Sequence, residues 1–277
     1  MLRPNEKYEP TDWSETMKFL SGTLPEITIN SEPEMSSTQT VAKDAARNGR
    51  PRWSVYVTDF QSAGRGRRDR SWQSVPGRDL TFSVILRPDV EAKYAQLLGL
   101  VASLSVSRTI RRISRDIADE VSIKWPNDVL IGGRKVCGII CEISGRDAAI
   151  DYAVLGIGVN VNRTLDELPR LDSPDRPNAT SLLVESGRRF GLPSLLGGIL
   201  TELSGMSGLI TTDENRRLFI AEYEPNCGTI GKRVKIVTDD GGFEGTASGI
   251  TRDGALIVRN EAEERVFYVG DVVHARL

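Results

Sequence analysis

Four arginines and two glycines occur within nine residues at Gly64–Trp72, in the order GRGRRDRSW. Glycine lets a backbone approach a ligand closely and lets a loop change shape. Arginine supplies planar donors that match a carboxylate or a phosphate, and Trp72 could cover an aromatic ring. The segment therefore favours an anion-binding loop over its alternatives, an ordinary surface loop or a patch for nucleic acid.

A second polar segment combines Lys124–Asp128 (KWPND) with Gly132–Gly138 (GGRKVCG). A lysine at the end of a strand, aimed into a cleft, can neutralise charge that develops on a phosphate. Asn127 and Asp128 offer an amide and a carboxylate that could hold a ribose, a metal ion or an incoming amine. On composition alone, a hairpin with solvated charges explains the segment equally well.

A third segment, Gly156–Asn162 (GIGVNVN), places glycines inside an expected strand. Such glycines often mark the close approach of a ligand or another backbone, and a period of two puts Asn160 on the same face. The glycine spacing does not fit the dinucleotide-binding fingerprint. A strand packed tightly on a helix is the alternative. Cys137 and Cys141, four residues apart in an apolar run, are expected in the core.

Composition excludes several classes of protein. The 277 residues hold 36 Lys and Arg against 38 Asp and Glu, a net charge of −2, which argues against a general binder of nucleic acid or anionic membranes. No apolar run approaches the roughly 20 residues that span a bilayer, and the N-terminus has no secretion signal. Three cysteines imply no disulfide scaffold. The single histidine, His274, excludes a zinc site built on histidine pairs. A cytoplasmic protein is expected.

The elements that must position these residues follow from periodicity. A helix is expected after Ser36–Thr38, strands over 53–59 and 80–86, a helix over 93–118, and short strands over 121–124, 129–131, 136–143 and 153–161. A loop over 163–178 and helices over 180–190 and 193–224 follow, with a break near residues 205 and 208. Five short apolar runs lie between residues 234 and 274, as in a small β-barrel. We therefore expect a polar N-terminal extension (1–30), an α/β catalytic domain (31–225) and a C-terminal barrel (228–277).

Together and in this order, the three segments resemble those of a biotin protein ligase. Ser36–Thr38, Ala179–Leu182 and Gly270–Arg276 also match that family's pattern. The resemblance covers about residues 31–277, and residues 1–30 are too few for the DNA-binding domain of the larger regulatory members, so a monofunctional type is implied. It implies a mixed-sheet catalytic domain of the biotin/lipoate ligase type with an SH3-like C-terminal barrel. Gln39 departs from the pattern, because many relatives have Asn there.

The resemblance also implies a reaction in two steps. Biotin and ATP, with Mg2+, first give biotinoyl-5′-AMP and pyrophosphate, and a lysine of a biotin carboxyl carrier domain from a biotin-dependent carboxylase then takes the biotinoyl group. No fixed metal site on the protein, no DNA and no membrane are expected as partners, and a monomer and a homodimer stay equally open. The loop at Gly64–Trp72 is expected to be mobile when empty and to be ordered by biotin.

The resemblance assigns the site residue by residue. The residues implied to bind biotin are Ser37, Thr38, Gln61, Arg65, Arg67, Lys135, Gly138, Gly156 and Gly158. Those implied to bind ATP or the adenylate are Arg67, Arg70, Trp72, Asn127, Lys135, Asn160 and Arg276. The residues implied in catalysis are Lys135, Arg67, Lys124 and Asp128, the last of them to receive or orient the acceptor amine.

Three other functions are weighed against this one. A lipoate ligase shares a related fold, but it would need a different arginine loop and would normally lack the barrel. A non-catalytic module that binds nucleic acid would show steep salt dependence, and the net charge counts against it. A protein that holds biotin without turnover is less consistent with the presence of Lys135 and Arg67.

Overall fold

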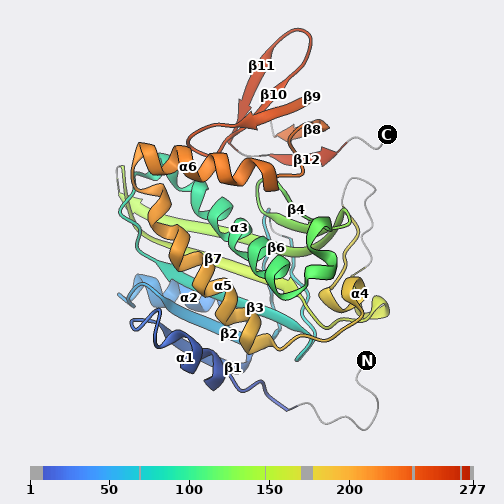
Figure 1. The fold of residues 1–277 in the computed structure, drawn as a ribbon. Helices are drawn as coiled ribbons and strands as arrows, with labels where there is room; N and C mark the ends of the chain where they lie inside the picture. Colours follow the sequence, from blue (N-terminus) through green and yellow to red (C-terminus); the bar gives the residue numbers. More distant parts are fainter. Residues whose placement is uncertain are drawn as a thin grey trace.

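A seven-stranded mixed sheet forms the centre of the molecule (Figure 1). The computed structural model describes residues 9–68, 70–146, 148–169, 177–238, 241–268 and 270–274. The strand order is β1-β2-β3-β7-β6-β5-β4, and β1 and β2 pair in parallel whereas the other neighbours pair antiparallel. The strands span Thr28–Met35 (β1), Ser54–Gln61 (β2), Asp79–Leu86 (β3), Val121–Lys124 (β4), Asp128–Ile131 (β5), Arg134–Arg146 (β6) and Ala149–Asn160 (β7). The expected mixed sheet is confirmed.

Helices cover both faces of this sheet. Helices α3 and α5 lie on one face, and α2 lies on the other. The helices span Ser14–Leu20 (α1), Thr38–Arg47 (α2), Gln96–Ile113 (α3), Leu182–Ser186 (α4), Leu192–Ser207 (α5) and Asp213–Tyr223 (α6). Short 3-10 turns span Ala92–Tyr94 (η1), Arg115–Glu120 (η2), Leu165–Glu167 (η3), Gly208–Ile210 (η4) and Glu224–Asn226 (η5). No helix of the described residues is long and apolar enough to cross a membrane.

Two expected helices are shorter in the structure. The helix predicted over 93–118 ends at Ile113, because Ser114 leaves the helical conformation and its hydroxyl donates to Asp116 Oδ1 at 2.9 Å. The helix predicted over 180–190 is only α4, which Gly187 ends in the left-handed conformation at φ 71°. The predicted break in the last helical region lies between α5 and α6, where the Thr212 side chain caps α6.

The strands divide their side chains between the two faces by strict alternation. In β7, Leu155, Ile157 and Val159 join the apolar core under α3 and α5. Val154 packs with residues of α2 on the opposite face. Gly156, Gly158 and Asn160 belong to that same face by period two. The sheet is therefore mostly apolar on one face and polar and glycine-rich on part of the other.

The segment expected as an N-terminal extension belongs in large part to this domain. Trp13, Leu20, Leu24 and Ile27 are buried in the main core, and α1 packs against α5, where Thr16 Oγ1 donates to the carbonyl of Pro193 at 2.9 Å. The sequence did not predict α1 because its apolar residues are few and separated by polar ones.

Five short strands form the C-terminal sheet, as predicted. They span Arg233–Thr238 (β8), Gly241–Ile250 (β9), Leu256–Arg259 (β10), Glu264–Phe267 (β11) and Asp271–His274 (β12), in the antiparallel order β11-β10-β9-β8-β12. Trp125 joins this sheet to the catalytic domain: its indole Nε1 donates to the carbonyl of Gly254 at 2.9 Å, and its backbone N–H donates to Thr229 Oγ1 at 3.1 Å. The side chain of His274 and all of Arg276 lie outside the described residues.

Candidate active site

A pocket opens on the α2 face of the sheet, over β3, β6 and β7. Its volume is about 430 Å3 including the solvent at its mouth. The lining residues that the sequence predicted are Ser37, Thr38, Gln61, Arg65, Arg67, Trp72, Asn127, Lys135, Gly138, Gly156 and Gly158. Three segments far apart in the chain therefore meet in one pocket, as the resemblance implied.

Two glycines, Gly138 and Gly158, form the floor of the pocket, and the indole of Trp72 lies on them. Gly138 of β6 and Gly158 of β7 face each other in the sheet. A Cβ atom on Gly158 would lie 2.4 Å from Trp72 Cε2, and one on Gly138 would lie 3.1 Å from Trp72 Cζ3. Trp72 therefore lies over this glycine pair in the structure, and the role of Gly138 in binding biotin stays a prediction. The indole N–H is buried and has no hydrogen-bond partner among the described residues.

The start of α2 forms the polar end of the pocket. Thr38 donates its backbone N–H to Gln61 Oε1 at 2.8 Å, and its hydroxyl lies 3.1 Å from the same atom. Ser37 takes the N-cap position, but its hydroxyl makes no capping bond. That hydroxyl is buried and unpartnered within the described part of the chain. A buried hydroxyl without a partner is costly, so it is well placed to bind a polar group of a ligand.

The arginine loop closes over the pocket from one side. Trp72 N donates to the carbonyl of Gly64 at 2.9 Å, and Gly66 N donates to the carbonyl of Arg70 at 2.7 Å. Arg67 NH1 donates to Asn127 Oδ1 at 2.8 Å. These bonds link the first motif to the second. Mobility of the empty loop stays a prediction.

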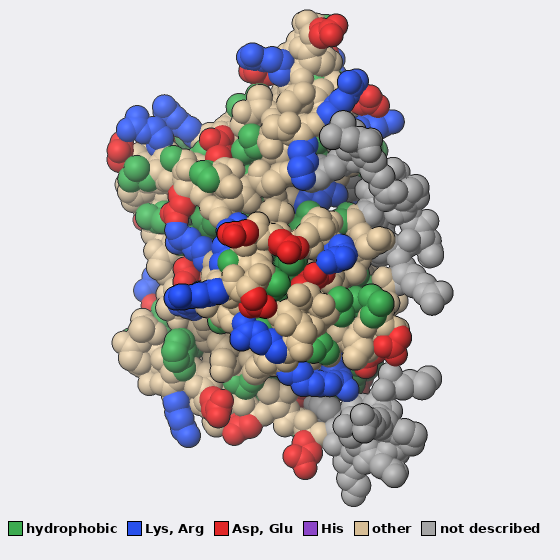
Figure 2. Space-filling model, turned by 45° about the vertical axis from the view of Figure 1, so that its right-hand side comes forward, with side chains coloured by type: hydrophobic (Ala, Val, Ile, Leu, Met, Phe, Trp, Pro, Cys, Tyr) green, Lys and Arg blue, Asp and Glu red, His purple; other side chains and the backbone are tan. Residues whose placement is uncertain are grey.

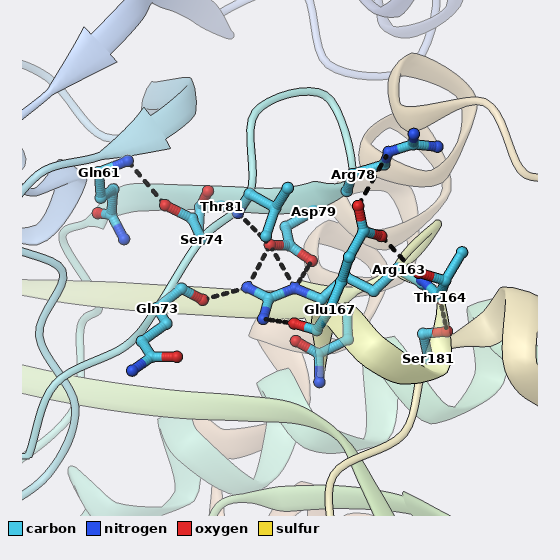
Figure 3. A network of polar contacts seen from close by, with 12 residues as sticks. Gln61, Gln73, Ser74, Arg78, Asp79, Thr81, Arg163, Thr164, Glu167 and Ser181 are labelled. Carbon is cyan, nitrogen blue, oxygen red and sulfur yellow. Dashed lines mark hydrogen bonds and ion pairs between the residues drawn. The ribbon is translucent and has the colours of Figure 1, made fainter. Parts of the chain in front are cut away.

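A buried network fixes the chain directly after Trp72 (Figure 3). Arg163 Nε lies 2.8 Å from both carboxylate oxygens of Asp79, and the Arg163 guanidinium also donates to the carbonyl of Gln73. Asp79 Oδ2 accepts from Val75 N at 2.8 Å, and Ser74 Oγ accepts from Gln61 N at 2.8 Å. The side chains of Arg163 and Asp79 are 1% and 0% exposed. The pair therefore holds the C-terminal end of the loop, and with it Trp72, over the sheet.

Lys135 places a positive charge on the pocket lining, beside the carboxylate of Asp128. Its Nζ lies 2.6 Å from Asp128 Oδ1, and it is 3.1 Å from the position of a Cβ on Gly138. Its backbone is held on both sides, because Lys135 N donates to the carbonyl of Asn178 and Thr180 N donates to the carbonyl of Lys135. With Arg67, it places two cationic side chains on the lining of one cavity.

Four predicted site residues within the described part of the chain do not line this cavity. Asp128 forms an ion pair with Lys135. Asn160 donates its amide N–H to the carbonyl of Thr180 at 2.9 Å, and this bond supports the segment whose Thr180 N–H bonds to the carbonyl of Lys135. Lys124 is the register partner of Asp128 across β4 and β5, Arg70 belongs to the arginine loop and its carbonyl accepts from Gly66 N, and Arg276 lies outside the described residues. The roles of Arg70, Asn160 and Arg276 in ATP binding, and of Lys124 and Asp128 in catalysis, stay predictions.

Burial explains the two cysteines of β6. Cys137 is fully buried in the core, and burial raises the pKa of its thiol far above the ordinary value. Burial also raises the pKa of Cys141 to about 12. Both therefore behave as core side chains, as expected, rather than as reactive thiols.

Sequence comparison assigns the family. Residues 33–160 match the model of the biotin/lipoate A/B protein ligase family, and residues 229–275 match the biotin protein ligase C-terminal domain. The bifunctional ligase/repressor BirA of Bacillus spizizenii is 32% identical over 86% of this chain and 71% of its own length. The chain belongs to the biotin protein ligase family. It is thus a ligase whose catalytic domain and SH3-like C-terminal domain are both those of the family.

Two further relatives match this biotin protein ligase over most of its length. The biotin–[acetyl-CoA-carboxylase] ligase of Mycobacterium tuberculosis is 31% identical over 80% of this chain and 79% of its own. The biotin protein ligase of Aquifex aeolicus, solved in complex with biotin and ATP, superposes with a TM-score of 0.74 and 27% identity, over 90% of this chain and 99% of that one. The lipoate ligase alternative is not supported by these matches, because the C-terminal domain is also present.

Acidic and basic side chains alternate over the face of the molecule drawn in Figure 2, in keeping with the near-neutral composition. This face therefore has no broad basic surface of the kind that a nucleic-acid module would need.

Proposed function

We propose that this biotin protein ligase activates biotin as biotinoyl-5′-AMP and transfers it to a lysine of a biotin carboxyl carrier domain. The observation that carries the proposal is the convergence of Lys135 and Arg67 on a pocket with a glycine floor and a polar end at Thr38 and Gln61. Such a pocket suits a ligand with a polar head, an apolar tail and a terminal carboxylate. The Aquifex aeolicus relative was solved with biotin and ATP, which supports the same two substrates here.

In the first step, a carboxylate oxygen of biotin attacks the α-phosphorus of ATP, and pyrophosphate leaves. The reaction brings anions together, and Lys135 and Arg67 offset that repulsion more strongly as charge grows in the transition state. Mg2+ enters with ATP as part of the substrate. Among the described residues, no group of three or more His, Cys, Asp or Glu side chains could hold a metal ion.

In the second step, the amine of the acceptor lysine attacks the carbonyl carbon of the adenylate, AMP leaves, and the amine loses a proton. Asp128 Oδ1 lies 2.6 Å from Nζ of Lys135, which lines the pocket. We assign Asp128 the orientation of the incoming amine. The partially covered pocket would shelter the adenylate from water between the steps.

The test is an intact-mass assay with a purified biotin carrier domain, biotin and Mg-ATP. We expect the carrier to gain the mass of one biotinoyl group and a carrier whose acceptor lysine is replaced by arginine to gain none. Lys135→Ala should slow adenylate formation by about 10²–10³, because one preorganised charge is removed. Lys93→Ala is the matched control, since Lys93 pairs with Glu91 on the surface. Unmodified carrier with the wild-type enzyme would overturn the proposal.

A further inference from the structure

Glu142 of β6 does not line the pocket, yet it contacts two residues that do. Its Oε2 accepts from Gln39 Nε2 at 2.9 Å and lies 3.6 Å from Arg65 NH1, and its Oε1 accepts from Lys43 Nζ at 2.8 Å. Burial opposes ionisation, but the hydrogen bonds from Lys43 and Gln39 and the charge of Arg65 outweigh it and lower the pKa of Glu142. The group is therefore a carboxylate, which only accepts hydrogen bonds.

This carboxylate and the carbonyl of Val154 together fix the orientation of the Gln39 amide. Gln39 Nε2 faces two acceptors, Glu142 Oε2 and the carbonyl of Val154 at 3.1 Å. Gln39 Oε1 must then point the other way, where Ser83 Oγ lies at 3.1 Å. An amide oxygen only accepts, so the single hydroxyl hydrogen of Ser83 is directed to Gln39.

The same reasoning continues into the pocket. Thr38 Oγ1 lies 3.0 Å from Ser83 Oγ and 3.1 Å from Gln61 Oε1. Ser83 has already used its hydrogen, and Gln61 Oε1 accepts from the backbone N–H of Thr38. The Thr38 hydroxyl must therefore donate to one of these two atoms. It offers only lone pairs to the pocket, while the Gln61 amide N–H group remains a donor.

We infer that Glu142 is a positioning residue that sets, through Gln39 and Ser83, which groups donate and which accept at the polar end of the pocket. An acceptor at Thr38 beside a donor at Gln61 fits an N–H group next to a carbonyl, the pattern of the ureido ring of biotin. Glu142 acts without touching the ligand. The inference rests on the proposed function, since it takes biotin as the ligand.

The test compares the binding of biotin and 2-iminobiotin by calorimetry. In 2-iminobiotin a C=NH group, a donor when protonated, replaces the ureido carbonyl. Glu142→Gln lets the residue at 142 donate as well as accept, so only the Val154 carbonyl still fixes the Gln39 amide, and the directions of the hydroxyls beyond it are set less strictly. We expect the variant to bind biotin about tenfold more weakly. The ratio of the dissociation constant for 2-iminobiotin to that for biotin should therefore fall by about tenfold. The rate of adenylate formation at saturating biotin should stay within about twofold.

Glu202→Gln is the matched control, because Glu202 pairs with Arg108 and Arg112 far from the pocket and is 22% exposed against 27% for Glu142. Ser83→Ala removes the hydroxyl in the middle of this series of hydrogen bonds. It should lower the ratio of the dissociation constants for 2-iminobiotin and biotin as Glu142→Gln does. A ratio that stays at its wild-type value in both variants would overturn the inference, even if both ligands bind more weakly. Absence of biotin binding by the wild-type chain would instead overturn the proposed function, and this inference with it.

Discussion

The two faces of the central sheet are built from the same strands, residue by residue in alternation, yet they have opposite chemistry. Under α3 and α5 the alternation places Leu155, Ile157 and Val159 of β7 in a continuous apolar core. On the α2 face the intervening positions are Gly156, Gly158 and Asn160, and a pocket opens there. The first face supplies stability, and the second gives up side-chain packing to leave room for a ligand. Stability and binding should therefore respond separately to substitutions at neighbouring positions.

The largest expected effect is on stability and comes from an exception on the α2 face, the buried residue Asp79. Asp79 of β3 lies on that face and is paired with Arg163 in full burial. Asp79→Asn leaves the guanidinium charge without its partner, which should lower the free energy of unfolding by about 3–5 kcal/mol. Urea unfolding followed by tryptophan fluorescence measures this change. Asp44→Asn, which removes the exposed pair with Arg47, should cost less than about 1 kcal/mol; equal effects would contradict the prediction.

The next substitution probes the apolar face alone. Leu155 is 0% exposed, and Leu155→Ala should lower the free energy of unfolding by about 2–5 kcal/mol through the lost apolar contacts and the cavity left behind. The dissociation constant for biotin, measured without urea and at low temperature, should stay within about twofold of the wild-type value. A loss of affinity as large as the loss of stability would show that the two faces are not independent.

A smaller effect probes the pocket face at Gly158, three residues further along β7. The methyl group of Gly158→Ala would lie 2.4 Å from Trp72 Cε2 and must displace the indole. Overpacking of this kind costs about 1–3 kcal/mol. We expect this cost to weaken the affinity for biotin roughly tenfold, as measured by calorimetry. Gly205→Ala is the control, because no atom lies within 4 Å of its added Cβ and alanine favours the helix. Unchanged affinity in Gly158→Ala would mean that the ligand does not use the glycine floor.

The smallest expected effect is one of pH. The pKa of Glu142 is lowered from 4.5 in the folded protein, with burial opposed by Lys43, Gln39 and Arg65. A lowered pKa means that its contribution to stability is fully present above about pH 4.5 and is lost as the pH falls through the lower, folded value. The difference in unfolding free energy between wild type and Glu142→Gln should therefore shrink when urea unfolding is repeated at about pH 3.5 instead of pH 7. A difference that grows on acidification would contradict this sign.

The sequence predicted the elements that have a clear period or a specific motif. The strand alternation from 153 to 161 and the glycines within it correctly indicated β7, and the arginine loop and Lys135 correctly indicated residues that share one pocket. Glu142 was not predicted, since a single acidic residue in an apolar strand carries no motif. Asp79 and Arg163 were missed because they lie 84 positions apart in the chain and meet only in the folded sheet. The position of Trp72 over Gly138 and Gly158 could not be predicted either, because the path of the arginine loop depends on that same ion pair between residues distant in the sequence.

The tryptophan of the KWPND segment has a consequence for the order in which the protein is assembled during synthesis. Trp125 is 1% exposed, and its indole bonds to a carbonyl 129 residues further along the chain, at Gly254. Until the ribosome has released that glycine, the side chain next to Asn127 and Asp128 has neither its hydrogen-bond partner nor its cover. The segment that contributes Asn127 to the pocket thus reaches its final support late in translation. A nascent chain stalled before the C-terminal sheet should therefore be a poor enzyme, even though its central sheet is already complete.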